Sequence, residues 1–297
     1  MRLIKPVEVL PSNLIASNVP LDDFAEWAAG SYTVGQTARY EMEAYECVGD
    51  TTDRPDLGAA KLAPTWIRLG YVNRWRCLRD GVDSITTNVE LIDITVADLG
   101  TSTSVAILNC KGLEAEITIT DPIEGVVYNE TASLIDHLVG DLWSWFFKPY
   151  EEIRNKIFSG FPPYPDPQIN IEIRGATPTD EVQCGRISVG SEIEIAFMTL
   201  YGTSVSRIDR SIKERDGFGN LRLVPRRSVQ IVDFRVAIPF SLFDFTERTL
   251  AGVSTTPCVY IGTTALQSTI VFGVHRDFRM DISDPEMCAA TIEVEGF

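Results

Sequence analysis

The sequence contains no segment of the kind that inserts a chain into a membrane or directs it out of a cell. No apolar run approaches the ~20 residues that a membrane-spanning helix needs. The first eight residues include Arg2 and Lys5, but no apolar stretch follows them, and so they do not resemble a signal peptide. We therefore expect no membrane insertion and a protein that is made and folded in a cytoplasm.

Cysteine and histidine are scarce, and neither occurs in a metal-binding pattern. The cysteines are scattered, with no C-x-x-C pair and no two at zinc-ligand spacing. Because a reducing compartment disfavours disulfides, we expect buried free thiols at all six positions: Cys47, Cys77, Cys110, Cys184, Cys258 and Cys288. His137 and His275 lie far apart and belong to no motif, which favours structural roles. The sequence predicts no metal site and no cofactor.

Catalytic signatures are also missing. The chain has no G-x-S-x-G, H-E-x-x-H, phosphate-binding, dinucleotide-binding or calcium-loop motif. Two carboxylates suffice for a glycosidase, and Asp209, Glu214 and Asp216 lie together in one loop region. The reading we favour makes these three solvated acids, paired with the arginines and lysine around them. We predict that the protein is not an enzyme and that it has no catalytic residues.

Acidic residues dominate the charge. The chain has 42 aspartates and glutamates against 26 lysines and arginines, a net charge of -16. Such a polyanion is repelled by nucleic acid. The dense basic stretches are residues 207–215 and 222–227, and acidic residues flank both. We expect no nucleic-acid partner and a chain that stays soluble at high local concentration, as an assembly subunit must.

What the sequence has in quantity is alternation of apolar and polar residues. Ala115, Ile117 and Ile119 alternate with acids and threonines, and Ile169, Ile171 and Ile173 repeat the pattern. Further strand-like runs are residues 90–96, 193–197, 229–238, 269–274 and 290–294. Many short strands separated by turn residues predict a mainly β fold, with a β-sandwich or jelly-roll-like body over residues 72–297.

One stretch has helical spacing instead. Leu134, Leu138 and Leu142 recur every four residues, and Ile153 and Ile157 continue the pattern beyond Pro149. This predicts a short helical insertion at about residues 133–158. The aromatic residues within it fit either a core or a ligand platform, and helical spacing favours the core: Trp143, Trp145, Phe146, Phe147 and Tyr150.

The segment at residues 211–227 is rich in charge and glycine. It predicts an exposed loop or a long hairpin between two strands, a position that often carries binding contacts. Lys213, Arg215 and Phe218 are the candidate assembly residues in it.

Residues 23–71 form a short segment that differs from the rest of the chain, because it is rich in aromatic and turn residues. The order W…Y-T-V-G-Q…Y…Y-E-C…P-T-W-I-R-L-G resembles the small chitin-binding carbohydrate modules of families 5 and 12. The resemblance implies a three-stranded domain whose aromatic rings stack on sugars. The glycan-binding candidates are Trp27, Tyr32, Tyr40, Tyr45 and Trp66; we expect the two tryptophans to be mostly structural and the tyrosines to form the surface.

This module departs from the family pattern at Gln36, where the family usually has an acidic residue after the turn glycine. A domain of ~50 residues must also build its core from the same aromatic residues. Two readings therefore stay open. The module either binds glycan or serves as a spacer or docking block.

A second resemblance covers most of the chain. The opening M-R-L-I-K-P-V-E-V-L-P-S-N-L-I-A-S-N-V-P, the small module, a strand-entry motif at residues 73–77 and the segment C-G-R-I-S-V-G at residues 184–190 resemble tail-associated virion proteins of tailed bacteriophages. The resemblance implies a structural component of the tail tip, baseplate or fibre-attachment region that acts by protein–protein assembly. It further implies other phage tail proteins as partners, location in the virion, and a homo-oligomer of three-fold or six-fold symmetry.

Two alternatives remain for this assignment. The chain is either a purely structural subunit or a receptor-binding protein that recognises a host surface glycan through the N-terminal aromatic module. The N-terminal arm, residues 1–22, holds several apolar residues. It either adds a strand to a neighbouring subunit or packs on its own domain.

Overall fold

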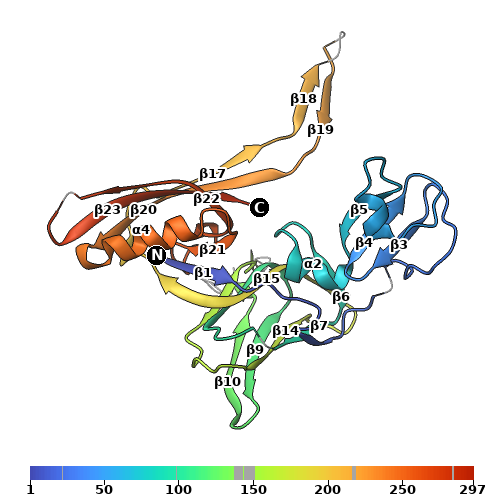
Figure 1. Cartoon of the computed structure of the whole chain (residues 1–297). Coiled ribbons are helices and arrows are strands. Elements are labelled where there is room, and N and C mark those ends of the chain that lie inside the picture. Colours follow the sequence, from blue (N-terminus) through green and yellow to red (C-terminus); the bar gives the residue numbers. More distant parts are fainter. Residues whose placement is uncertain (22, 98, 137–142, 144–150, 216–218, 283) are drawn as a thin grey trace.

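Alternating strands build most of the chain, and their burial follows the period of two seen in the sequence. The computed structural model describes residues 1–297 except residues 22, 98, 137–142, 144–150, 216–218 and 283. In strand β9 (Glu114–Asp121), Ala115, Ile117 and Ile119 are buried and the residues between them are partly exposed. The predicted mainly β fold is confirmed, with antiparallel sheets and few helices (Figure 1).

A five-stranded sheet forms one layer of the body. In spatial order its strands are β10 (Gly125–Ser133), β9, β14 (Gln168–Arg174), β7 (Leu91–Val96) and β2 (Leu14–Ser17). Its inner face is aliphatic and its outer face is polar. On the outer face Glu116 and Glu172 lie directly opposite each other, and Arg174 forms ion pairs with both. This arginine offsets the repulsion that two facing carboxylates produce.

Eleven of the described strands form a larger, curled sheet. Along its main path the order is β13 (Lys156–Ser159), β8 (Ser104–Lys111), β15 (Glu181–Glu194), β1 (Arg2–Pro6), β21 (Cys258–Ile261), β22 (Ile270–Asp281), β23 (Met287–Gly296), β20 (Ser228–Pro239) and β16 (Met198–Thr199). Two strands pair beside this path: β6 (Thr86–Val89) with β15, and β17 (Ser204–Asp209) with β20. Helix α4 (Phe243–Gly252) lies against the curled half, between the single turns η1 (Phe240–Leu242) and η2 (Gln267–Thr269) in the chain (Figure 1).

The large sheet is shared by two main hydrophobic cores. One core lies between the five-stranded sheet and the half that contains β8 and β15, and the other lies between the β20–β23 half and α4. In β8, Ile107 faces the first core, whereas Ala106 and Leu108 face a smaller cluster on the opposite side. A strand buried on both faces reads as a continuous apolar run, and so β8 shows no alternation in the sequence.

The first strand joins the two halves of the large sheet. β1 pairs with β15 on one side and with β21 on the other, and β2 pairs with β7 in the five-stranded sheet. Leu3 belongs to the core around α4, and its neighbour Ile4 belongs to the smaller cluster. Of the two alternatives for residues 1–22, the structure shows the second, because these strands pack on their own chain.

The N-terminal module folds as a three-stranded sheet, as predicted. It consists of β3 (Thr37–Tyr40), β4 (Glu43–Cys47) and β5 (Trp66–Tyr71), with helix α1 (Pro55–Ala59) between the last two strands.

The expected strand entry at residues 73–77 is wrong. This segment is helix α2 (Asn73–Arg79), whose Trp75 and Leu78 are three residues apart and are buried in the sandwich core. Residues at this spacing share one face of a helix, and that face closes the end of the core. A helix of seven residues with three buried side chains is too short to show a period in the sequence.

The predicted helical insertion is also corrected at both of its ends. Ile135–Asp136 (β11) pairs with Glu151–Glu152 (β12), and β13 pairs with the edge of β8, where Ile157 lies opposite Ala106. An open sheet edge satisfies the backbone of this segment better than an isolated helical turn, and it overrides the leucine spacing. Trp143 is exposed, whereas Leu138, Leu142 and the other aromatic residues of the insertion lie outside the described residues.

The segment at residues 211–227 is a long hairpin, one of the two forms predicted. β17 and β20 run out of the large sheet and continue as β18 (Ile212–Arg215) and β19 (Leu221–Val224), which pair only with each other among the described strands. The hairpin rises away from the body (Figure 1). We call residues 204–228 the hairpin arm.

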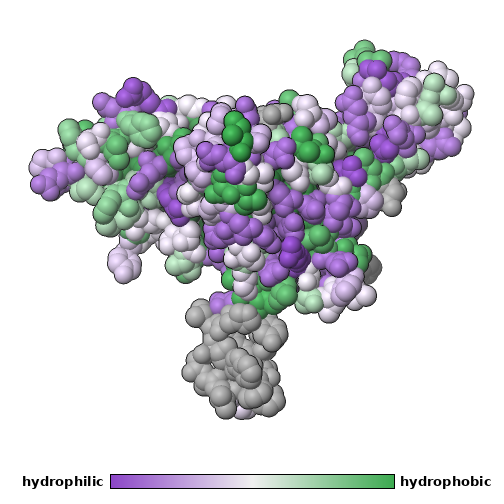
Figure 2. Space-filling view, turned by 90° about the horizontal axis from the view of Figure 1, so that it is seen from below, coloured by the Kyte–Doolittle hydropathy of each residue, from purple (hydrophilic) through white to green (hydrophobic). Residues whose placement is uncertain are grey.

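The six cysteines are all buried free thiols, as predicted. None of the described helices is long and apolar enough to cross a membrane. On the face seen from below, hydrophilic residues predominate and apolar residues lie in separate groups (Figure 2).

The position of β1 predicts a large effect of a small deletion in it. Leu3 is fully buried, and so Leu3→Ala should lower the free energy of unfolding by ~2–5 kcal/mol through lost burial and the cavity it leaves. Leu10→Ala, at an exposed leucine of the same N-terminal segment, should change it by less than about 0.5 kcal/mol. Urea unfolding measures both, and equal effects of the two substitutions would contradict the placement of β1.

Candidate functional site

Two of the five aromatic candidates in the N-terminal module face its interior. Trp66 is 0% exposed and Tyr45 is 5% exposed, and with Ala38 and Cys47 they form the core of the module. The Tyr45 hydroxyl donates to Glu43 at 2.6 Å, and burial together with this carboxylate raises the pKa of Tyr45. The structure agrees with a structural Trp66 but corrects the surface position expected for Tyr45. A domain this small has little else with which to fill its core.

The other three candidates are half-buried and do not form a flat platform. Trp27 meets Tyr40 edge to face, with ring centroids 6.1 Å apart and planes at 84°. Tyr32 packs on Trp66 in the same manner at 5.1 Å and 63°. The guanidinium of Arg54 lies over the ring of Tyr40, 4.8 Å from its centroid. A sugar that stacks on that face of Tyr40 must displace Arg54.

The hairpin arm is the most exposed part of the described chain. All six residues of β17 are exposed, and so are most residues of β18 and β19. Its exposed apolar side chains include Leu221 and Leu223, at 55% and 58%. No residue of β17, β18 or β19 is buried, whereas β9 and β14 bury one face and β8 buries both.

The candidate assembly residues of the sequence lie on this arm. Lys213 forms an ion pair with Asp209 at 2.7 Å, and that pair lowers the pKa of Asp209. Arg215 donates to the carbonyl of Gly219 at 3.4 Å. Asp209 is therefore an ion-paired solvated acid, as favoured over a catalytic role; Phe218 and Asp216 lie outside the described residues.

The arm also reverses the charge of the chain. Residues 204–228 contain seven arginines and lysines against three acids, while the whole chain has 26 against 42. Exposed charge of one sign on an oppositely charged protein marks a surface for electrostatic steering.

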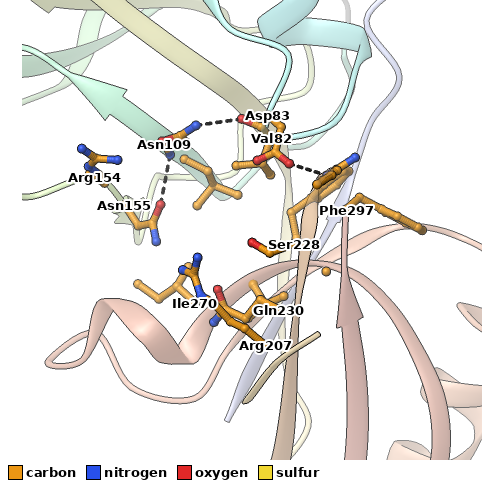
Figure 3. A pocket seen from close by; sticks show the side chains of 15 residues that line it. Val82, Asp83, Asn109, Arg154, Asn155, Arg207, Ser228, Gln230, Ile270 and Phe297 are labelled. Atoms are coloured by element: carbon orange, nitrogen blue, oxygen red, sulfur yellow. Dashed lines mark hydrogen bonds and ion pairs between the residues drawn. The ribbon is translucent and has the colours of Figure 1, made fainter. Parts of the chain in front are cut away.

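A pocket of about 310 Å³ lies at the base of the arm. One wall comes from β8 and the segment before β13, with Asn109, Arg154 and Asn155. The opposite wall comes from β17, β20 and β22, with Arg207 and Gln230 (Figure 3). Segments far apart in the sequence thus meet here.

Hydrogen bonds hold the polar wall of the pocket in place. Asn109 adopts a left-handed backbone conformation (φ 51°), which asparagine tolerates better than most residues. Its side chain donates to the Val82 carbonyl at 3.0 Å, and its backbone N–H donates to Asn155 Oδ1 at 3.0 Å. Gly185 is required beside it, because a Cβ there would lie 2.1 Å from the Val82 oxygen.

His275 is buried away from this pocket. Its Nδ1 lies 3.0 Å from the hydroxyl of Tyr260, and burial lowers the pKa of His275 although Asp277 opposes the shift. This agrees with the structural role expected for it; His137 lies outside the described residues. Within the described ranges no group of three or more histidine, cysteine or acidic side chains is arranged to hold a metal ion.

Comparison with protein-family models, curated proteins and solved structures gives no match to this chain.

The sequence indicated only some of the arginines that line the pocket. Arg207 and Arg227 belong to the two basic stretches noted in the sequence, but Arg154 stands alone before a strand that was expected to be helical. No spacing rule links these three positions, since tertiary folding alone brings them together.

The buried His275 predicts a pH dependence of stability. The unfolded chain has a histidine pKa of ~6.5, and the folded value is lower, so as the pH falls the unfolded chain takes up the proton first. The stability contributed by neutral His275 is therefore complete above about pH 6.5 and is lost below it. Urea unfolding at about pH 7.5 and pH 5 should show a larger loss for the unsubstituted protein than for His275→Gln. Identical losses would contradict this assignment.

Proposed function

We propose that this chain is an assembly subunit that contacts a neighbouring copy of itself through the hairpin arm. The exposure of the arm on both faces carries the proposal. An isolated two-stranded hairpin is only marginally stable in water, and exposed apolar residues on it gain free energy when a partner covers them. A hairpin of this length with Leu221 and Leu223 exposed is best explained by a partner surface.

A second exposed surface offers a place for such an arm. Phe197, Met198, Tyr201 and Leu266 are all exposed around a hollow of about 790 Å³ at the end of β15 and β16. Because this hollow and the outer part of the arm are different surfaces, a contact between them joins copies head to tail. Head-to-tail contacts close into rings when the rotation allows, as the expected three-fold or six-fold symmetry requires.

Charge favours a second copy as the partner. The arm is basic and the chain as a whole has a net charge of -16, so the arm of one copy is attracted to the body of another. The net charge of -16 repels nucleic acid, which disfavours nucleic acid as an alternative partner.

The context we propose for this assembly is a bacteriophage tail. The resemblance of the opening, the small module and the later segments to tail-associated proteins supports a place at the tail tip, baseplate or fibre-attachment region, with other phage tail proteins as further partners. A β-rich body with a projecting arm suits a subunit that is repeated around a tail. The protein would then be part of the virion and synthesised in the host cytoplasm.

Because the arm is exposed, we predict that substitutions in it change self-association without changing the stability of the single chain. Leu221→Asp combined with Leu223→Asp should weaken self-association at least about 100-fold, because two carboxylates become buried in the contact. The free energy of unfolding of the single chain should change by less than about 1 kcal/mol, since both leucines are exposed in it. Sedimentation velocity over a range of concentrations measures the first quantity, and urea unfolding measures the second.

A matched control is available in the turn between β9 and β10. Ile123 is 93% exposed and lies outside the arm, so Ile123→Asp should leave self-association unchanged. Unaltered association of the arm variant, or an equal loss in both proteins, would refute the role of the arm.

The alternative is a receptor-binding protein that recognises a host surface glycan through the N-terminal module. The observation in its favour is the pair of Trp27 and Tyr40, which pack edge to face and are both partly exposed. The edge-to-face packing and the cover by Arg54 make this the weaker of the two proposals.

The glycan alternative predicts a loss of binding from one ring. If Tyr40 contacts sugar, Tyr40→Leu keeps apolar volume in the module but removes the flat face, and affinity for chitin oligosaccharides or host envelope polysaccharide should fall about tenfold. Calorimetric titration measures this affinity. Tyr164→Ala, at a tyrosine outside the module, is the control. Binding that Tyr40→Leu leaves unaffected, or no binding by the unsubstituted protein, would rule out the alternative.

A further inference from the structure

Arginines gather at the base of the hairpin arm in a chain that is otherwise acidic. The pocket described above adjoins a second hollow of about 500 Å³, and Arg227, Phe272 and Phe297 line both. We call the two hollows together the arginine groove. Its charged lining is five arginines, Arg79, Arg154, Arg186, Arg207 and Arg227, against three acids, Glu8, Asp80 and Asp83.

Three of these arginines have carboxylate partners. Arg227 forms an ion pair with Asp83, Arg79 forms one with Glu8, and Arg154 lies 3.1 Å from Glu152. These pairs account for two of the three acids of the groove.

The other two arginines have no carboxylate partner within the described part of the chain. Arg207 lies on β17 in the wall of the first hollow and takes part in no ion pair there. Arg186 lies on β15 in the wall of the second hollow, where its side chain donates to the Asp80 carbonyl at 2.9 Å. A guanidinium is always charged, and so Arg207 and Arg186 each carry a positive charge without a direct ion pair; Asp80, in the lining of the second hollow, offsets the charge of Arg186 only in part.

Arg186 is held where that charge is unfavourable. Its guanidinium stacks over Phe272, 4.7 Å from the ring centroid, and burial lowers the pKa of Arg186. A desolvated cation without a counter-ion is destabilising unless an anion is supplied from elsewhere. The stacking fixes the guanidinium plane beside the groove.

Three amides in the lining already donate hydrogen bonds within the chain. Asn109 donates to Val82, Asn155 donates to Gln267 at 3.3 Å, and Gln230 donates to Ser268 at 2.7 Å. These bonds hold the amides in place, and the neutral groups can add contacts to a ligand. The groups that carry charge are the guanidinium N–H groups, which match the paired oxygens of a phosphate or carboxylate.

From this arrangement we infer that the arginine groove is a binding site for a small ligand bearing a phosphate or carboxylate group, with Arg207 as its principal contact. The first hollow, at about 310 Å³, is within the size range of small-molecule sites. The inference goes beyond the proposed function, although Arg207 and Arg227 belong both to the groove and to the hairpin arm.

Calorimetric titration of the purified full-length chain tests the inference, with inorganic phosphate and citrate as probes at constant ionic strength. The unsubstituted protein should bind at least one of them saturably, at one site per chain. Arg207→Gln should weaken that binding about tenfold, the loss expected for one charge-assisted hydrogen bond. Phosphate binding alone would identify phosphoryl ligands, and citrate binding alone would identify carboxylates.

Arg222→Gln is the matched control. Arg222 is exposed on β19, away from the groove lining, and its loss removes the same charge. Binding by this variant should equal that of the unsubstituted protein. Arg154→Gln, on the facing wall, should also weaken binding. It serves as the second test if Arg207→Gln alters the fold.

Two results would overturn the inference. One is that neither phosphate nor citrate binds saturably. This result would overturn the inference even if an acidic polymer such as polyglutamate, tested as a third probe, does bind. The other is an equal loss in the Arg207 and Arg222 variants, which would show a general charge effect. Arg207 also belongs to the basic hairpin arm, so Arg207→Gln and Arg222→Gln should weaken self-association to a similar extent, whereas only Arg207→Gln should weaken anion binding. The Leu221 and Leu223 variant should still bind the anion, so failure of one proposal is separable from failure of the other.

Discussion

The insertion of β1 between β15 and β21 is the contact on which the rest of the structure depends. It makes one continuous sheet out of a half that packs against the five-stranded sheet and a half that packs against α4. Leu3 and Ile4 are buried on opposite faces, and so the strand is held by the core around α4 on one face and by the smaller cluster on the other. The two walls of the arginine groove come from these two halves, so their spacing follows from this strand.

The distribution of charge follows from the same architecture. The chain as a whole has a net charge of -16, whereas basic residues gather on the hairpin arm and in the groove at its base. In the proposed assembly, the basic arm of one copy is attracted to the acidic bodies of other copies, while those bodies repel one another. Because β18 and β19 pair only with each other among the described strands, substitutions in them should change such an association more than the stability of the single chain.

Much of the fold was predictable, because a strand buried on one face alternates apolar and polar residues in the sequence. β9 and β14 alternate as expected, the N-terminal module has its three strands, and residues 211–227 form a hairpin. The errors lie where local pattern and tertiary context disagree. Residues 135–136, 151–152 and 156–158 lie in the stretch with helical spacing but pair as strands. Helix α2 forms where Trp75 and Leu78 close the end of a core. Tyr45 shows the same limit, since a tyrosine in a small module serves as core as readily as surface.

The sequence by itself determined the mainly β class, the buried thiols, the acidic charge and the basic stretches of the arm, because composition and a period of two are local properties of a chain. Only the tertiary structure decided that residues 1–6 bridge two halves of a sheet, and that Arg154, Arg186, Arg207 and Arg227 line one groove. These residues come from separate strands and loops, and their convergence depends on strand order and sheet curl. Strand order is set by the summed burial of two cores, a quantity that no short segment contains.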